Sequence, residues 1–134
     1  MQLSIIIVNY NVTGFLRSCL LSIRRYVSSI EYEVLVIDNN SADLSWRDLI
    51  IEFPEVKFIA NGKNEGFAVA NNKAIRESKG KYILLLNPDT EFESDFIGQL
   101  LLFADDKEDL GCIGVRMHDV KGTFLPESKR AVPD

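Results

Sequence analysis

Short apolar runs of β-favouring residues alternate along this chain with longer segments of helical periodicity. Most of the runs are continuously hydrophobic, which is typical of strands that are buried on both faces of a sheet. We expect five strands, at Leu3–Val8, Tyr32–Ile37, Val56–Ala60, Tyr82–Leu86 and Cys112–Val115. Because strands and helices follow each other in strict order, the pattern predicts an α/β fold, with a mostly parallel sheet and helices on both faces.

The apolar positions between the runs predict four helices and the side that each helix buries. Pro54 closes the second helix, and Gly80 stands where a C-terminal cap would end the third. The predicted inner faces are Phe15, Leu16, Cys19, Leu20 and Ile23; Trp46, Leu49, Ile50 and Phe53; Phe67, Ala70, Asn71, Ala74 and Ile75; and Phe96, Leu100 and Phe103.

The size and charge of the chain exclude several classes of protein. Its 134 residues are enough for one domain, and 20 acidic against 15 basic residues give a net charge of -5. A nucleic-acid binder needs an excess of basic residues, so we expect no nucleic-acid partner. No apolar run is long enough for a transmembrane segment or a signal peptide, which predicts a cytoplasmic protein. Cys19 and Cys112 are expected to be buried, reduced thiols.

Polar residues rich in Asn and Asp follow four of the predicted strands. In an open parallel sheet these loops meet at the carboxyl ends of the strands, where ligands bind. The glycine patterns GxGxxG and GxxxxGK[ST] are absent, which disfavours a dinucleotide-dependent dehydrogenase or a P-loop NTPase. A bound diphosphate would then need another counter-charge. Asp89 could supply it by holding a divalent cation whose other ligands are phosphate oxygens.

Each candidate residue also has a purely structural interpretation. Asp38 could accept hydrogen bonds from a base or a ribose hydroxyl, but an aspartate at the end of a strand also forms helix caps and Asx-turns. Gly66 could simply let the loop enter the following helix. Tyr10, at the same predicted edge, could stack on a base. A response regulator with Asp38 as phosphoacceptor would need acidic residues after the first strand, and these are missing.

Four segments together resemble a known family. Their order and spacing are those of the family 2 glycosyltransferases with the GT-A fold, which is Rossmann-like. The four segments are SIIIVNYN, VLVIDNNSAD, NEGFAVANNKAI and YILLLNPDT. The chain is most similar to the rhamnosyltransferase-like members that build bacterial surface polysaccharides, and the resemblance covers about residues 3–118. It implies inverting, metal-assisted transfer of a sugar from a nucleotide-diphosphate-sugar to the hydroxyl of a saccharide or a lipid-linked acceptor.

The resemblance also implies roles for individual residues. Asn87 departs from the family pattern, because many relatives carry Asp there, and this change removes one charge from the metal-binding motif. Asp89 would hold Mg2+ or Mn2+. The nucleotide would contact Val8, Asn9, Tyr10, Asp38 and Asn40, and the donor sugar and diphosphate would contact Asn64, Gly66, Asn71, Asn72 and Asn87.

The general base of the family is expected further downstream than residue 134, so no catalytic residue is assigned. Residues 1–118 are predicted to form the donor-binding half, and residues 119–134 a polar loop or hairpin that leads to a missing acceptor-binding part. We therefore expect an apparently truncated GT-A fold that is inactive in transfer by itself. The alternative is a non-catalytic nucleotide-sugar binding module.

The sequence leaves several properties open. UDP- and dTDP-linked donors are both compatible with it, and so are a monomer and a homodimer formed through exposed strand edges. The full-length protein would be cytoplasmic or peripheral to the inner face of the membrane.

Overall fold

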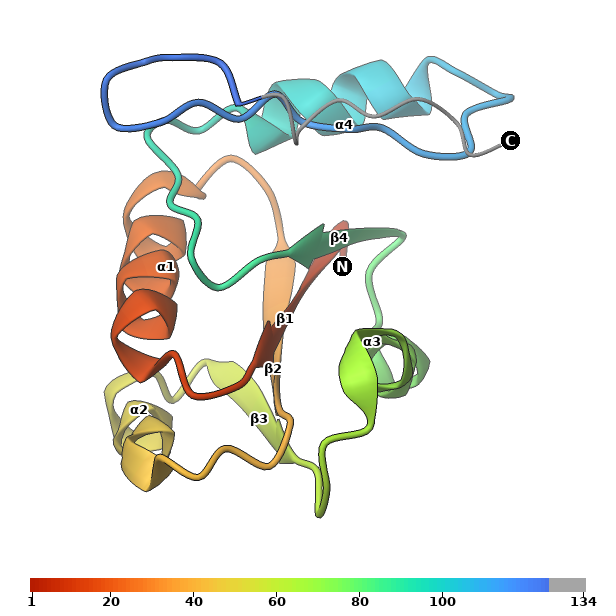
Figure 1. Ribbon diagram of the computed structural model, residues 1–134. Coiled ribbons are helices and arrows are strands. Elements are labelled where there is room, and N and C mark those ends of the chain that lie inside the picture. Colours follow the sequence, from red (N-terminus) through yellow and green to blue (C-terminus); the bar gives the residue numbers. More distant parts are fainter. Residues whose placement is uncertain (126–134) are drawn as a thin grey trace, which may run out of the picture. The chain divides into compact units, whose positions relative to one another are not determined.

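The computed structural model describes residues 1–125, and the chain divides into two compact units, Met1–Gln99 and a second that begins at Leu100. The first unit is built on a four-stranded parallel sheet in the order β3-β2-β1-β4 (Figure 1). These strands confirm four of the five predicted runs, and β1 lies in the middle of the sheet beside β2 and β4. Their bounds are β1 (Leu3–Asn9), β2 (Tyr32–Asp38), β3 (Val56–Ala60) and β4 (Tyr82–Leu86).

Helices cover both faces of this sheet, as the sequence predicts. In the first unit, α1 and α2 lie on one side of the strands and α3 lies on the other (Figure 1). The helical elements are α1 (Thr13–Tyr26), the 3-10 helix η1 (Leu44–Arg47), α2 (Asp48–Glu52), α3 (Gly66–Glu77) and α4 (Ile97–Asp105), the last of which crosses into the second unit.

Small residues bring α3 close to the sheet. Ala70 and Ala74 pack against Ile6 of β1 and against Leu35 and Ile37 of β2, and all five are fully buried. Because successive strand residues point to opposite faces, the alternate positions of these strands face α1 and α2. On that side Trp46 of η1 stacks on Phe58 of β3, with ring centroids 6.2 Å apart. Both faces of the central strands are therefore sealed.

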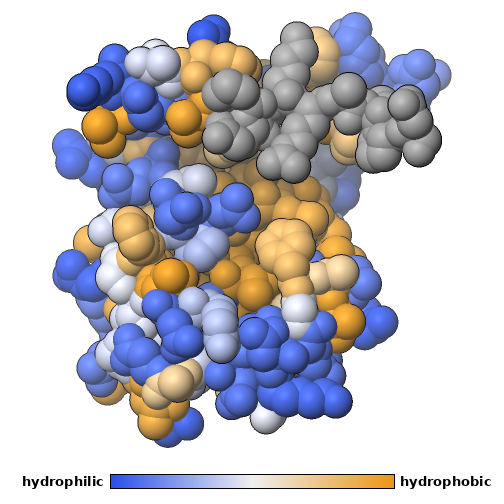
Figure 2. Space-filling model, viewed as in Figure 1, coloured by the Kyte–Doolittle hydropathy of each residue, from blue (hydrophilic) through white to orange (hydrophobic). Residues whose placement is uncertain are grey.

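The edge strand β4 is less protected than the central strands. Ile83 and Leu85 pair in register with Ser4 and Ile6 of β1, yet they are 41% and 49% exposed. Figure 2 shows apolar side chains gathered over the middle of this side of the molecule and bordered by hydrophilic residues. The sheet thus has one well-buried centre and one half-covered border.

Some predicted helix faces were wrong. Phe15, Ile50 and Phe67 are exposed, although each was expected on an inner face. Phe15 and Phe67 lie in the first turns of α1 and α3, beyond the packed core of the sheet. The predicted face of the fourth helix was displaced, because α4 begins at Ile97, after Phe96. Its buried residues are Ile97, Leu101 and Ala104 in place of Phe96, Leu100 and Phe103.

Gly80 does not cap α3, which corrects a second expectation. The helix ends at Glu77 with Ser78 as its C-cap, and the backbone N–H of Gly80 donates to Ser4 Oγ at 2.8 Å. A Cβ atom on Gly80 would overlap the backbone of Leu3 and Ser4. The glycine is therefore needed where the chain passes against β1 on its way into β4.

The second unit contains no strand at Cys112–Val115 within its described residues, so the fifth predicted strand was wrong. This short run is interrupted by glycine and finds no ladder partner in the described chain. Instead, an isolated antiparallel bridge joins His118 to Phe124, and the backbone N–H of Asp119 donates to the Thr123 carbonyl at 2.9 Å.

Other expectations on this part of the chain have mixed outcomes. Cys112 is exposed, contrary to the prediction, whereas Cys19 is buried as expected, and both thiols are free. The predicted tail of residues 119–134 lies partly outside the described residues, and the predicted boundary at residue 118 stays a prediction. Across residues 1–125, no helix combines the length and the apolar character that crossing a membrane requires.

Candidate functional site

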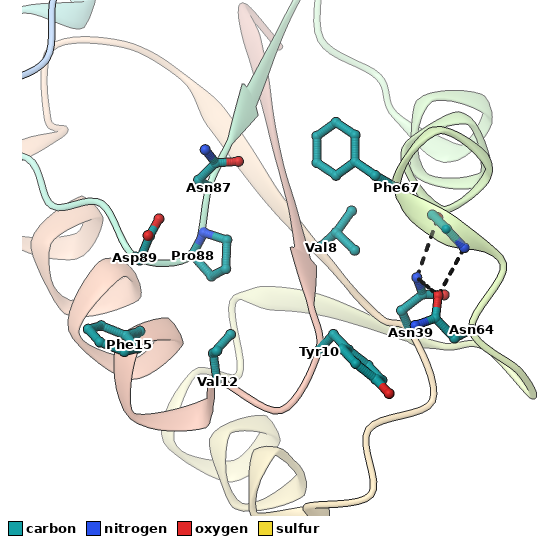
Figure 3. A pocket seen from close by; sticks show the side chains of 11 residues that line it. Val8, Tyr10, Val12, Phe15, Asn39, Asn64, Phe67, Asn87, Pro88 and Asp89 are labelled. Atoms are coloured by element: carbon teal, nitrogen blue, oxygen red, sulfur yellow. Dashed lines mark hydrogen bonds between the residues drawn. The ribbon is translucent and has the colours of Figure 1, made fainter. Parts of the chain in front are cut away.

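A pocket of about 540 Å³ lies at the carboxyl edge of the sheet in the first unit. It opens between the ends of β1 and β4 and the first turns of α1 and α3 (Figure 3). This volume falls in the range of small-molecule sites, and the position is the one that open parallel sheets use for ligands. Its lining residues are Val8, Tyr10, Val12, Phe15, Asn39, Asn64, Gly66, Phe67, Asn87, Pro88 and Asp89.

Three exposed aromatic rings surround the pocket. Tyr10 follows β1, Phe15 lies in the first turn of α1, and Phe67 lies in the first turn of α3 (Figure 3). Tyr10 is 49% exposed and Phe67 is 59% exposed. Aromatic faces of this kind can stack on a planar base or pack on the apolar face of a sugar. The sequence identified Tyr10 for such a role, but it missed Phe15 and Phe67 because their positions matched the inner faces of helices.

The segment that follows β4, here called the β4 turn (Asn87–Thr90), presents a carboxylate to the pocket. The Asn87 carbonyl accepts the backbone N–H of Thr90 at 3.3 Å and the Thr90 hydroxyl at 2.7 Å, which closes the turn. Asp89 and Asn87 are both exposed and line the pocket. The turn therefore contributes an acidic group and an amide to the same pocket wall.

Helix α1 anchors the chain just after the β4 turn. The hydroxyl of Ser22 accepts the backbone N–H of Phe92 at 3.0 Å and donates to the Cys19 carbonyl at 2.7 Å. Burial, with further contributions from the charges of Glu91 and Asp89 and despite a hydrogen bond with Thr90, raises the pKa of the Cys19 thiol to about 12. Cys19 is therefore a neutral packing residue beneath this loop, with no reactive thiolate at neutral pH.

The residues of the β4 turn suit a divalent cation that takes some of its ligands from the protein and the others from a bound molecule. The described residues contain no group of three or more His, Cys, Asp and Glu side chains that could hold a metal ion. Asp89 offers one carboxylate to the pocket, and Asn87 offers an amide oxygen to the same pocket. Mg2+ is commonly held by one or two carboxylates together with substrate phosphates, so this donor set suits a cation that arrives with a diphosphate.

The segment at the carboxyl end of β2, here called the β2 turn (Asp38–Ser41), is arranged differently. Asp38 is 3% exposed, and its Oδ1 accepts Asn9 Nδ2 at 2.9 Å and Ser41 Oγ at 2.6 Å. Its Oδ2 accepts the backbone N–H of Ser41 at 3.0 Å. These are the contacts of a turn-forming aspartate, and neither Asp38 nor Asn9 lines the pocket. Their contact with a nucleotide stays a prediction.

Three other predicted residues also lie away from the lining of the pocket. Asn40 is exposed with a φ of 62° in the β2 turn. Asn71 is buried in α3 and its Nδ2 donates back to the Phe67 carbonyl at 2.9 Å, whereas its neighbour Asn72 is exposed. The roles that the resemblance implies for these three asparagines stay predictions.

The start of α3 is a polar wall of the pocket. Gly66, with a φ of 81°, is the first residue of the helix, so it has the permissive role that the sequence suggested. The first N–H groups of a helix carry a partial positive charge that favours anions. Asn64 precedes them and also lines the pocket, as does Asn39, which the sequence did not single out. Asn39 could have been identified from its place beside Asp38 at the end of β2.

Comparisons with known proteins agree with this architecture. The family model described as Glycosyl transferase family 2 matches residues 4–131. The putative glycosyltransferase EpsH of Bacillus subtilis is 29% identical over 110 residues, which are 80% of this chain and 31% of EpsH. An N-acetylglucosaminyl-diphospho-decaprenol L-rhamnosyltransferase of Mycobacterium tuberculosis is 27% identical over 87% of this chain and 40% of its own length. The chain spans about a third of the length of the first curated relatives it matches.

Solved structures show the same fold. TarS of Staphylococcus aureus, residues 1–349, superposes with a TM-score of 0.70 at 22% identity, over 79% of this chain and 33% of that protein. The same protein has been solved in complex with UDP and with UDP-GlcNAc, with TM-scores of 0.70 and 0.71. The predicted GT-A architecture is therefore confirmed.

Proposed function

Because this chain belongs to glycosyl transferase family 2, we propose that its pocket binds the nucleotide-diphosphate-sugar donor of an inverting glycosyltransferase. The observation that carries the proposal is the composition of the pocket wall. An exposed aspartate, a helix N-terminus and an exposed tyrosine line one cavity at the carboxyl edge of the sheet. A nucleoside diphosphate has a matching group for each of them: a cation-linked diphosphate, phosphate oxygens and a planar base.

Each wall would bind a different part of the donor. The Tyr10 ring would stack on the base, and Asn64 and the first turn of α3 would donate hydrogen bonds to phosphate or sugar oxygens. Asn87 and Asp89 would hold Mg2+ or Mn2+, which when bound neutralises charge on the diphosphate leaving group. The protein residues thus orient the donor so that its anomeric carbon is open to an acceptor hydroxyl.

Named relatives support a wider role in polysaccharide synthesis. A bacterial rhamnosyltransferase supports synthesis of a bacterial surface polysaccharide. So does the poly(ribitol-phosphate) beta-glucosyltransferase of Bacillus spizizenii, which is 28% identical in an alignment that covers all of this chain and 22% of its own length. The acceptor would then be a saccharide or a lipid-linked glycan, reached from the cytoplasmic side of the membrane. The TarS complexes support a UDP-linked donor, and dTDP shares the pyrimidine imide that such a site would recognise.

A second candidate function is a nucleotide-sugar binding module. Asp89 is the one carboxylate among the lining residues of this pocket. An aspartate that holds a cation does not also deprotonate an acceptor hydroxyl, so these residues supply donor binding without a general base. Release of sugar from UDP-GlcNAc by the chain supports an enzyme, whereas binding without turnover supports a module.

Calorimetric titration tests the donor site. The chain is titrated with UDP and with dTDP, each with and without Mn2+, and Tyr10→Ala is compared with the exposed control Tyr10→Phe. We expect Mn2+-dependent binding that Tyr10→Phe retains and Tyr10→Ala weakens. If a chain that is folded by circular dichroism binds neither nucleotide, the proposed function is wrong.

A further inference from the structure

A hydrogen-bonded set of three asparagine side chains, here called the amide relay (Asn39, Asn61 and Asn64), connects the end of β2 to the start of α3. We propose that Asn39 is a positioning residue that, together with the backbone N–H of Gly66, holds the Asn64 amide with its Nδ2 toward the bound donor. This inference rests on the proposed function, because it concerns the same pocket. It extends that function to a residue whose own side chain is committed to other protein groups.

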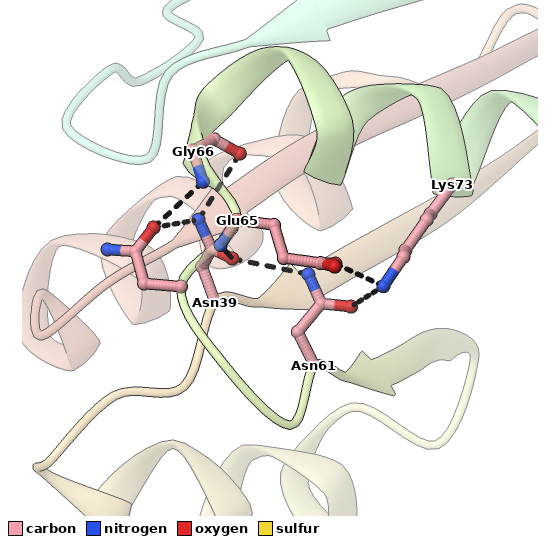
Figure 4. Close-up of polar contacts among 6 residues, drawn as sticks. Asn39, Asn61, Glu65, Gly66 and Lys73 are labelled. Carbon is pink, nitrogen blue, oxygen red and sulfur yellow. Dashed lines mark hydrogen bonds and ion pairs between the residues drawn. The ribbon is translucent and has the colours of Figure 1, made fainter.

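The position of the Asn39 backbone is fixed by contacts that do not involve its side chain. It follows directly after β2, is 3% exposed, and its backbone N–H donates to the Asn9 carbonyl of β1 at 2.9 Å. From this position its side chain reaches the segment between β3 and α3 (Figure 4). Its Oδ1 accepts the backbone N–H of Glu65 at 3.1 Å, and its Nδ2 donates to Asn64 Oδ1 at 2.8 Å.

Backbone donors fix the direction of two amides in the relay. A backbone N–H can only donate, so the atom of Asn39 that faces the Glu65 N–H must be the oxygen, and its other atom must be Nδ2. The same argument applies to Asn64, whose Oδ1 accepts the backbone N–H of Gly66 at 2.9 Å as well as Asn39 Nδ2. These bonds occupy the oxygen of Asn64, which leaves its Nδ2 as the atom for the pocket.

The other end of the relay is anchored by a cation. Asn61 Nδ2 donates to Asn39 Oδ1 at 3.2 Å, and Asn61 Oδ1 accepts Lys73 Nζ of α3 at 3.0 Å. Lys73 also pairs with Glu65 (Figure 4). The ammonium group can only donate, so it sets the direction of Asn61 as the backbone sets the others. Every member is directed the same way, and the Asn64 amide presents a donor where phosphate or sugar oxygens would lie.

An isosteric change at Asn39 would disrupt this orientation of the Asn64 amide. In Asn39→Asp, an oxygen replaces Nδ2 and faces Asn64 Oδ1, which has no proton to give. The repulsion between the two oxygens is relieved only if the Asn64 amide turns, which gives up its bond from the Gly66 N–H, or moves away, and either change displaces its Nδ2 from the donor. The anionic ligand thereby loses a hydrogen-bond donor, and we expect UDP affinity to fall by about tenfold or more.

A double-mutant cycle separates this effect from the added negative charge. The affinity for UDP with Mn2+ is measured for the wild type, Asn39→Asp, Asn64→Ala and the double variant. A charge acts whether or not Asn64 is present, whereas the relay acts only through Asn64. We therefore expect Asn39→Asp to weaken binding by about tenfold in the wild-type background and by less than about threefold in Asn64→Ala. Equal losses in the two backgrounds contradict the proposal.

The matched control is Gln2→Glu, which also changes an amide into a carboxylate. Gln2 Oε1 accepts the backbone N–H of Glu31 at 2.9 Å, at the opposite edge of the sheet from the pocket. This control should retain the UDP affinity of the wild type. If the wild type itself does not bind UDP, the proposed function and this inference are both overturned. If it binds and Asn39→Asp binds equally well, only the inference is overturned.

Nuclear magnetic resonance of the wild-type chain gives a second test that needs no variant to fold. The side-chain amide protons of Asn64 should shift when UDP and Mg2+ are added. Those of Asn39 should exchange with solvent more slowly than those of Asn64, because both of its polar atoms are engaged. Asn64 side-chain signals that stay fixed at saturating UDP, or equal exchange rates for the two side chains, contradict the assignment of Asn39.

Discussion

The β2 turn and the β4 turn lie on either side of β1 at the same edge of the sheet, and each contains an aspartate next to asparagine or proline. Asp38 of the β2 turn is buried and accepts three hydrogen bonds from Asn9 and Ser41, whereas Asp89 of the β4 turn is exposed and lines the pocket. The same kind of sequence therefore produces a buried carboxylate that is hydrogen-bonded within the protein in one place and an exposed carboxylate that lines the pocket in the other.

The positions of the two strands explain the difference. β2 has neighbours on both sides, so the chain leaving it is packed between the ends of β1 and β3 and binds their polar groups. β4 has one neighbour among the described strands, so the chain leaving it has an open side. The carboxylate of an aspartate at the end of a central strand is thus more easily engaged in hydrogen bonds within the protein than one that follows an edge strand.

Replacement of Asp38 should have the largest effect on stability. Asp38→Ala leaves the buried donors of Asn9 and Ser41 without their acceptor, so we expect the free energy of unfolding to fall by about 3 kcal/mol. Urea denaturation followed by circular dichroism measures it. Asp89→Ala is the matched control, and should change stability by less than about 0.5 kcal/mol because its side chain is exposed. Similar losses in both variants would remove the contrast between the turns.

Replacement of Asp89 should weaken the binding of UDP but leave the stability of the chain almost unchanged. Asp89→Ala removes the carboxylate that we propose for the cation, so Mn2+-dependent affinity for UDP should fall by about tenfold or more, and binding without Mn2+ should change little. Calorimetric titration of the variant and the wild type measures this. Asp89→Asn, which keeps an oxygen ligand but no charge, should retain part of the affinity. Unchanged Mn2+ dependence in Asp89→Ala would exclude this aspartate as a cation ligand.

The anchor beneath the β4 turn should connect stability with binding. Ser22→Ala leaves the buried backbone N–H of Phe92 without its acceptor, and we expect a loss of about 1–2 kcal/mol in the free energy of unfolding. Because the β4 turn then moves more freely, Mn2+-dependent UDP affinity should also fall. Ser18→Ala, an exposed serine on the same helix, is the control that should change neither quantity. A loss of stability with unchanged affinity would show that this anchor does not position Asp89.

The smallest expected effect is that of pH on the start of α3. A hydrogen bond and an ion pair with Lys73 hold the pKa of Glu65 below its ordinary value of 4.5. A lowered carboxylate pKa adds stability above the ordinary value, and this stability is lost as the pH falls through the folded-state pKa. Glu65→Gln should therefore melt slightly below the wild type at neutral pH and approach it in acid. Thermal melts across pH test this, with the exposed Glu108→Gln as the control. A gap that widens in acid would have the wrong sign.

The parts of the fold that the sequence predicted correctly are those that local hydrophobic patterns indicate, without knowledge of which distant segments come into contact. The apolar runs identified β1 to β4, because the central strands β1 and β2 are buried on both faces and the outer strands β3 and β4 still need apolar residues on the face that packs on the core. The run at Cys112–Val115 has the same local character but no ladder partner in the described residues, and pairing is a long-range property. The prediction that Gly80 caps the third helix failed for a similar reason, because the close approach of Ser4 cannot be inferred from residues that neighbour Gly80 in the sequence.

The candidate site was predicted in part. Tyr10 and Asp89 were identified from the loops that follow strands, and the resemblance to the family added Val8, Asn64, Gly66 and Asn87. All six line the pocket. Phe15 and Phe67 were missed because helical periodicity does not tell which turn extends past the sheet. Asp38 and Asn39 are adjacent in sequence, and only the packing of the neighbouring loops decides which of them reaches the pocket.

Chemical-shift mapping of the backbone amides on addition of UDP and Mg2+ tests the central contrast most directly. We predict that the largest changes occur at Tyr10, at Asn64 to Phe67, and in the β4 turn, whereas Asp38 and Ser41 of the β2 turn change little. Shifts that are largest at Asp38 and Ser41, with the β4 turn unmoved, would contradict the proposal that Asp89 faces the ligand and Asp38 does not.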